Sequence, residues 1–115
     1  MARPNGSSQP PPTPSFDIRE RRDERGVVRL SLFGELDLAV ADRLTSRLQQ
    51  LASAHATVIL DLSDLQFIDS TGLAILFTNF NHASNNGWQL RVDPNLTGQV
   101  RRAVELVGLD SILWP

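Results

Sequence analysis

A short segment in the second half of the chain carries the residue types best suited to chemistry. Residues 69 to 72 are Asp-Ser-Thr-Gly, so the neighbouring hydroxyl groups of Ser70 and Thr71 lie between a carboxylate and a glycine. A serine or threonine hydroxyl can act as a nucleophile when a general base activates it, or it can receive a phosphoryl group from another enzyme. The two uses make different demands on the rest of the sequence.

The composition argues against catalysis. The chain contains no Cys, which excludes thiol catalysis and zinc–thiolate sites. It also contains no Lys, since all eleven Lys or Arg residues are Arg, and this excludes Schiff-base chemistry and the P-loop. His55 and His82 fall at predicted helix ends, and the Gly-x-Ser-x-Gly turn of serine hydrolases is absent. A metal site or phospho-aspartate receiver built on Asp61, Asp64 and Asp69 is disfavoured, because a receiver also needs a lysine, and these carboxylates are more simply turn and capping groups. We therefore expect a binding protein and not an enzyme, with no cofactor and no metal.

The bulk properties predict one small domain in a reducing compartment. The chain has 115 residues, of which 41% are hydrophobic, enough for a single modest core. A formal charge of −2 argues against a nucleic-acid partner. No apolar run reaches membrane-spanning length, and the N-terminus lacks the apolar core of a signal peptide. We expect a soluble, cytoplasmic protein that binds neither nucleic acid nor membranes.

The N-terminal segment differs in composition from the rest of the chain. Residues 1–15, with the sequence MARPNGSSQPPPTPS, contain five of the seven prolines. This composition is typical of a disordered tail, and a proline-rich docking motif is the less favoured alternative. We expect the folded domain to occupy residues 16–115.

Hydrophobic periodicity predicts alternating strands and helices in that domain. The expected elements are strands at 16–22 and 27–34, a helix from 39, a strand at 57–62 covered on both faces, a helix marked by Leu73, Leu76, Phe77, Phe80 and Ala83, a strand at 88–92, a helix within 93–108, and residues 111–114 as a candidate last strand. Phe77 and Phe80 are expected in the core. Strands that alternate with helices imply right-handed crossovers and a mainly parallel sheet, which the opening hairpin makes mixed. The predicted fold class is a small single-domain α/β fold with a mixed, mainly parallel sheet and packed helices.

In this layout the Asp-Ser-Thr-Gly segment begins the second helix, just beyond the carboxyl end of a strand. Ser70 is placed at the N-cap, where its oxygen can accept a hydrogen bond from a free backbone N–H, and capping alone is the alternative to a functional role. Gly72 favours the functional role of Ser70 over capping alone. Glycine makes a helix less stable than alanine does, by up to about 1 kcal/mol, but it lets the backbone of another protein approach Ser70. Residues 34–37, Gly-Glu-Leu-Asp, should bring Asp37 to the same edge as Asp69, where open α/β sheets bind ligands and partners.

Four segments in order resemble a known family. They are GELD (34–37) followed by a helix, VILDLSDLQFIDSTGLAIL (58–76), GWQLRV (87–92) and VRRAVELVGL (100–109). Together they resemble the STAS domain of bacterial anti-sigma factor antagonists over roughly residues 16 to 114. The Asp-Ser-Thr-Gly turn within its apolar frame is the most specific part of the resemblance.

The resemblance implies a partner switch in transcription regulation. In such proteins the hydroxyl that follows the aspartate, here Ser70, is phosphorylated by a partner that is both a serine kinase and an anti-sigma factor, with Thr71 as the alternative site. The unmodified form would bind the anti-sigma factor and free the sigma factor, phosphorylation would break that complex, and a phosphatase would restore it. The implied partner-binding residues are Asp37, Asp69, Ser70, Thr71 and Gly72. The alternative is a STAS module that never cycles phosphate and serves as a scaffold or as a subunit of a transport system.

Overall fold

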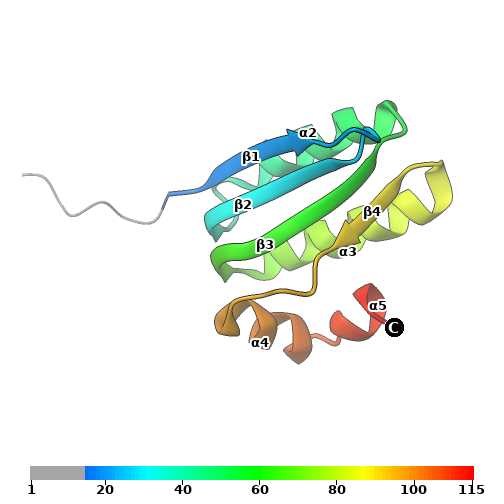
Figure 1. Ribbon diagram of the computed structural model, residues 1–115. Helices are drawn as coiled ribbons and strands as arrows, with labels where there is room; N and C mark the ends of the chain where they lie inside the picture. The colour runs from blue at the N-terminus through cyan, green and yellow to red at the C-terminus, as the bar shows by residue number, and fades with distance from the viewer. Residues whose placement is uncertain (1–14) are drawn as a thin grey trace, which may run out of the picture.

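The computed structural model describes residues 15–115. The tail expected at residues 1–15 therefore lies, except for its last residue, outside the described residues. In chain order the elements are β1 (Asp17–Arg22), β2 (Val28–Leu36), α2 (Ala41–Ser53), β3 (Thr57–Ile68), α3 (Ser70–Asn86), β4 (Gln89–Val92), α4 (Gly98–Leu106) and α5 (Asp110–Leu113) (Figure 1). The predicted order of elements is confirmed as far as α4.

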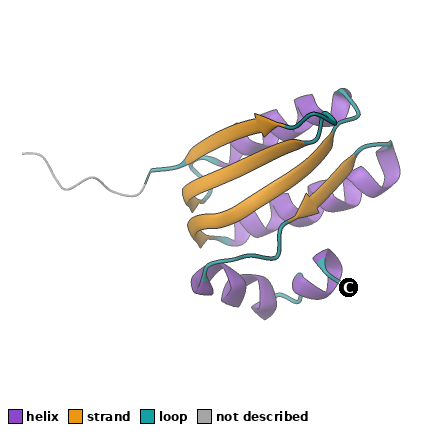
Figure 2. Cartoon of the chain, viewed as in Figure 1, coloured by secondary structure: helices purple, strands orange, loops and turns teal. Residues whose placement is uncertain are grey.

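The sheet has four strands in the order β1-β2-β3-β4. Strand β1 runs antiparallel to β2, whereas β2, β3 and β4 are parallel to one another. Helices α2 and α3 lie against the same face of the sheet (Figure 2). Helix α4 lies beside the C-terminal part of β3, where Thr97 Oγ1 donates to Leu65 O, and α5 lies near β4. The predicted α/β class with a mixed, mainly parallel sheet is confirmed. In residues 15–115 no helix is both long enough and apolar enough to cross a membrane.

Strand β3 is covered on one face only, so the prediction that it is buried on both faces is wrong. Val58, Leu60 and Leu62 are fully buried toward α2 and α3, whereas Ile59 and Asp61, which point to the other face, are half-buried. The aliphatic run at 57–60 was misleading because Ile59 belongs to the open face.

The open face carries an ion-pair cluster across three segments. Arg29 Nη1 lies 3.1 Å from Asp61 Oδ2 and 3.3 Å from Asp93 Oδ2. Partial burial by itself would raise the pKa of Asp61, but hydrogen bonds from the hydroxyl and N–H of Ser63, together with the Arg29 charge, outweigh it and hold the pKa below its ordinary value. The Asp61 carboxylate thus has a structural role, as the partner of Arg29 and Ser63 on the open face of the sheet.

Strand β3 continues beyond its predicted end at residue 62 as far as Ile68. Its last buried side chains, Leu62, Leu65 and Ile68, are three residues apart instead of two. The pairing with β2 explains this spacing, because its register shifts twice, and at each shift β3 inserts an extra residue that restores the buried face. The extended strand brings Asp69 to the end of β2, where its N–H donates to Leu36 O at 3.1 Å.

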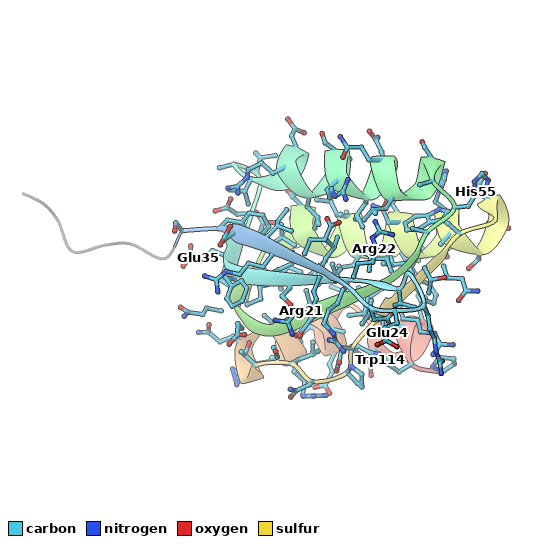
Figure 3. All side chains as sticks on the ribbon, turned by 45° about the horizontal axis from the view of Figure 1, so that its top comes forward. Arg21, Arg22, Glu24, Glu35, His55 and Trp114 are labelled. Atoms are coloured by element: carbon cyan, nitrogen blue, oxygen red, sulfur yellow. The ribbon has the colours of Figure 1, made fainter. Side chains whose placement is uncertain are left out.

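The last segment is helical, so the candidate strand at 111–114 is wrong. Leu109 and Leu113 are both buried and lie four residues apart, a helical spacing, and Leu113 N donates to Leu109 O at 2.9 Å. A short apolar run fits either structure, and here its length and spacing favour one helical turn. Trp114 Nε1 donates to Val92 O at 2.7 Å, so the indole lies against the edge strand β4 (Figure 3).

Candidate functional site

Helix α3 is capped by Asp69 and not by Ser70, so the predicted N-cap is wrong by one residue. Asp69 has an extended backbone, and its Oδ1 accepts a hydrogen bond from Gly72 N at 2.9 Å. Asp and Ser are both good N-caps, so a sequence with the two side by side does not determine which one caps the helix. Ser70 becomes the first helical residue.

The Ser70 side chain is free of a capping role. It is exposed, and the cap bond from Gly72 N goes to the Asp69 carboxylate and not to the Ser70 hydroxyl. Thr71 is half-buried, which makes Ser70 the more accessible of the two hydroxyl groups. The interpretation of Ser70 as a cap alone is therefore wrong.

Gly72 serves packing inside the molecule. It is buried, and a Cβ added to it would lie 2.6 Å from Ile68 Cγ1 and 2.9 Å from Leu36 Cγ. The glycine lets the first turn of α3 approach the ends of β2 and β3. These contacts give the glycine an internal reason, and the expected one, room for a partner's backbone, stays a prediction.

Asp37 lies at the same edge as Asp69, as predicted. Asp69 contacts the chain on both sides of Asp37, because its N–H donates to Leu36 O at 3.1 Å and its Oδ2 accepts from Leu38 N at 3.1 Å. Asp37 is half-buried, and its Oδ1 accepts from Ala39 N at 3.0 Å in the turn that leads into α2. The structure thus brings the Gly-Glu-Leu-Asp corner and the Asp-Ser-Thr-Gly turn together.

No histidine is placed to activate Ser70. Figure 3 shows His55 at the opposite end of the molecule from Glu35, which lies near the end of β2 beside this site. His82 follows Ser70 by twelve residues along α3, about 18 Å at the helical rise, and its Nδ1 accepts from Trp88 Nε1.

Residues 15–115 contain no group of three His, Cys, Asp or Glu side chains that could hold a metal ion. Asp69 is a capping group, as predicted.

Apolar side chains surround Ser70, and sequence reasoning missed them. A groove of about 280 Å³ is lined by Ser70, Leu73, Ala74, Phe77, Val107, Leu109 and Ile112. The large hydrophobic side chains exposed in the described part of the chain are Leu38, Phe67, Phe77, Leu106, Val107 and Ile112. Four of these belong to α3 or to the segment from the end of α4 to α5, Phe67 lies close before α3, and Leu38 lies in the turn that Asp69 contacts.

Phe77 is part of this surface and not of the core, which corrects the prediction made for it. Its side chain is 42% exposed, whereas Phe80 is half-buried and packs against the core. Spacing alone could not separate the two, because three residues turn a helix by less than a full turn. Leu106 and Val107 are visible in the sequence as apolar residues at a helix end, but nothing local marks them as exposed.

Comparison with known proteins places this geometry in a family. The family model described as "STAS domain" matches residues 19–115. The chain belongs to the STAS domain family. Among its relatives, "Anti-sigma-F factor antagonist RsfB" of Mycobacterium tuberculosis is 33% identical over 91 residues, covering 77% of this chain and 72% of the relative.

Solved structures share the STAS fold. The crystal structure of an anti-sigma factor antagonist from Mycobacterium paratuberculosis matches with a TM-score of 0.73 and 24% identity, covering 87% of this chain and 84% of that chain. SpoIIAA, described as an anti-sigma factor antagonist in its unphosphorylated form, matches with a TM-score of 0.66 and 21% identity over 83% of this chain and 84% of that chain. SpoIIAA of Bacillus is also solved in a phosphorylated form, which matches with a TM-score of 0.65 and 21% identity over 83% of this chain and 86% of that chain.

Proposed function

We propose that this STAS domain is an anti-sigma factor antagonist, a regulatory binding protein that is released from its partner by phosphorylation of Ser70. The observation that carries the proposal is the exposed Ser70 hydroxyl, which has no capping role and lies at the rim of an apolar groove. The relatives support it, because RsfB is named as an anti-sigma-F factor antagonist and SpoIIAA exists in unphosphorylated and phosphorylated forms.

The apolar surface supplies the attraction in the unmodified state. A side chain the size of Leu, Val or Phe stabilises a complex by about 1.5–3 kcal/mol when it passes from full exposure to full burial. Phe77, Val107 and Ile112 line one groove beside Ser70 and are all exposed in the free domain. We assign this surface to the anti-sigma factor, which is also the serine kinase.

A phosphate on Ser70 would act on the complex and leave the fold intact. It adds a charge of roughly −1.5 to −2 at neutral pH. The N-terminus of α3 attracts that charge by about 0.3–1 kcal/mol at an exposed site, whereas Asp69 repels it through solvent that screens both effects. Burying the phosphate unpaired in an interface would cost several kcal/mol, and each ~1.4 kcal/mol lowers affinity tenfold. A phosphatase would then restore binding.

The test uses the anti-sigma factor recovered with the tagged chain by pull-down and mass spectrometry. The purified anti-sigma factor and ATP are incubated with wild type, Ser70→Ala and Thr71→Ala, and the phosphosite is mapped. We expect wild type and Thr71→Ala to be labelled and Ser70→Ala to be unlabelled. Full labelling of Ser70→Ala, or a pull-down that recovers only transport or scaffold proteins, contradicts the proposal.

The apolar surface has its own test. Val107→Asp is expected to weaken binding of the unmodified domain at least tenfold, because it places a charge in the groove beside Ser70. Gln49→Asp, an exposed change on α2, is the matched control and should bind as wild type does. Equal affinity of the Val107→Asp and Gln49→Asp variants would exclude this groove from the interface.

A further inference from the structure

Asp69 makes two side-chain hydrogen bonds that point to different elements. Oδ1 accepts from Gly72 N in its own helix at 2.9 Å. Oδ2 accepts from Leu38 N at 3.1 Å, although Leu38 precedes it by 31 residues. Capping of α3 requires only the first bond. The second bond joins the turn between β2 and α2 to the start of α3.

The turn that Asp69 reaches is joined to the start of α3 at two points: Asp69 N–H donates to Leu36 O at the end of β2, and Leu38 N donates to Asp69 Oδ2. Its own bonds are local, since Asp37 Oδ1 accepts from Ala39 N at 3.0 Å and Asp37 O accepts from Val40 N at 3.2 Å. Val40, the N-cap of α2, makes no side-chain cap bond. These contacts shape the turn, and the bond from Asp69 N to Leu36 O fixes the end of β2, but none of them extends from residue 38 to the start of α3. The Asp69 carboxylate makes that contact, through Leu38 N.

Leu38 is the reason this position matters. Its side chain is 74% exposed, which makes it one of the most exposed large hydrophobic residues of the described chain. A flexible turn that carried such a side chain would lose conformational freedom on binding, and a turn held in place beforehand loses less. The bond from Leu38 N to Asp69 Oδ2 holds Leu38 itself next to the start of α3, so Leu38 and the groove beside Ser70 can form one surface.

We propose that Asp69 is a positioning residue for partner binding, whose carboxylate holds Leu38 beside Ser70 so that both enter the interface as one preformed surface. The inference rests on the proposed function, because the interface it serves is the one assigned there to the anti-sigma factor. Leu38 thereby becomes a contact residue.

Two substitutions separate the bond to Leu38 from capping. In Asp69→Asn the amide oxygen can still cap Gly72 N, but the amide nitrogen is a donor and cannot accept from Leu38 N. In Asp69→Ser the short hydroxyl caps the helix but does not extend to the turn, which guards against a flipped amide in the Asn variant. Asp64→Asn is the matched control, because it removes the same charge from an exposed site on β3.

Amide hydrogen exchange in the free protein tests the positioning. We expect exchange at Leu38 N–H to be faster by roughly tenfold or more in Asp69→Asn and Asp69→Ser, and unchanged in Asp64→Asn. The Gly72 N–H should stay protected in at least one of the two Asp69 variants. Unchanged exchange at Leu38 in both variants would overturn the inference.

A double-mutant cycle tests the consequence for binding, with the purified anti-sigma factor as probe. Leu38→Ala and Asp69→Asn should each raise Kd about tenfold, and the double variant should bind about as weakly as the weaker single variant, because both changes remove the same contact. Losses that multiply would overturn the inference while the proposed function stands, since Asp69 would then act independently of Leu38. Wild type that does not bind the anti-sigma factor contradicts the proposed function, whereas exchange at Leu38 still decides whether Asp69 holds the turn.

Discussion

Replacing Gly72 by alanine is the sharpest test of how the start of α3 is packed. The added Cβ would lie 2.6 Å from Ile68 Cγ1, 2.9 Å from Leu36 Cγ and 3.1 Å from Leu36 Cδ2. Carbon atoms in contact prefer separations of about 3.5–4.0 Å. Leu36 and Ile68 are both buried in the core, so neither side chain can move aside into solvent. Relief of the contact requires the first turn of α3 to shift away from the ends of β2 and β3.

The change in the free energy of unfolding that Gly72→Ala should cause is the difference between two opposed effects. Alanine is favoured over glycine in a helix by about 1 kcal/mol. Overpacking of a filled core costs typically about 1–3 kcal/mol, and two buried neighbours place this site in the upper half of that range. The free energy of unfolding should therefore fall by about 1–2 kcal/mol. For a domain of this size each kcal/mol lowers Tm by roughly 4–8 °C.

Urea and thermal unfolding followed by circular dichroism measure this effect, and the chain supplies a matched control. Gly98 is the first residue of α4, and a Cβ added there would meet nothing within 4 Å. We expect Gly98→Ala to be as stable as wild type or slightly more stable. If Gly72→Ala unfolded at the same urea concentration as Gly98→Ala, internal packing would not explain Gly72, and approach of a partner's backbone would again be the better reason for it.

Three further predictions follow from single contacts. Trp114→Phe should lower the free energy of unfolding by about 1 kcal/mol in urea titrations, because Val92 O loses the indole donor that lies 2.7 Å away. Gly34→Ala should cost more than Gly72→Ala in the same titrations, because Gly34 has φ +87° and the added Cβ would overlap the carbonyl oxygen of Ser15. The folded-state pKa of Asp61 is lowered from 3.8, so its contribution to stability is present above that pH and is lost as the pH falls through the folded-state value. Wild type should therefore exceed Asp61→Asn in stability at pH 7, and the excess should shrink toward pH 3 in parallel urea titrations.

Most of the fold could be predicted from the sequence, because hydrophobic periodicity reports which side chains face the core. The strand–helix alternation and the mixed sheet follow from that pattern. The pattern failed where the backbone is irregular. Leu62, Leu65 and Ile68 remain buried three residues apart because β3 carries two extra residues opposite β2, and no rule of strict alternation can anticipate them. The helical turn at residues 110–113 was missed because four residues are too few to show a period.

The candidate site was predictable in its location and not in its details. The meeting of the Asp37 corner with Asp69 follows from the rule that parallel strands end at the same edge of a sheet. Which residue caps α3 depends on backbone angles one residue apart, and Asp69 and Ser70 suit the N-cap equally. The exposure of Leu38 and Phe77 depends on contacts between distant segments, so local sequence carries no signal for it.

Because Asp69 precedes Ser70 and caps α3 in its place, the position of Ser70 has a physical consequence for the proposed switch. Because Asp69 caps the helix, Ser70 has helical geometry, and the Cα–Cβ bond of a helical residue tilts toward the helix N-terminus. A phosphate on Ser70 would therefore extend toward the Asp69 carboxylate and the turn that holds Leu38. The free N–H groups of the helix attract the phosphate there, whereas the carboxylate repels it, so the two effects oppose each other in the free domain. In the free domain the phosphate also keeps its hydration, so it has little effect on folding. When a partner covers Ser70 and excludes water, the phosphate loses that hydration and the complex is destabilised. An exposed site can in this way control binding without controlling folding.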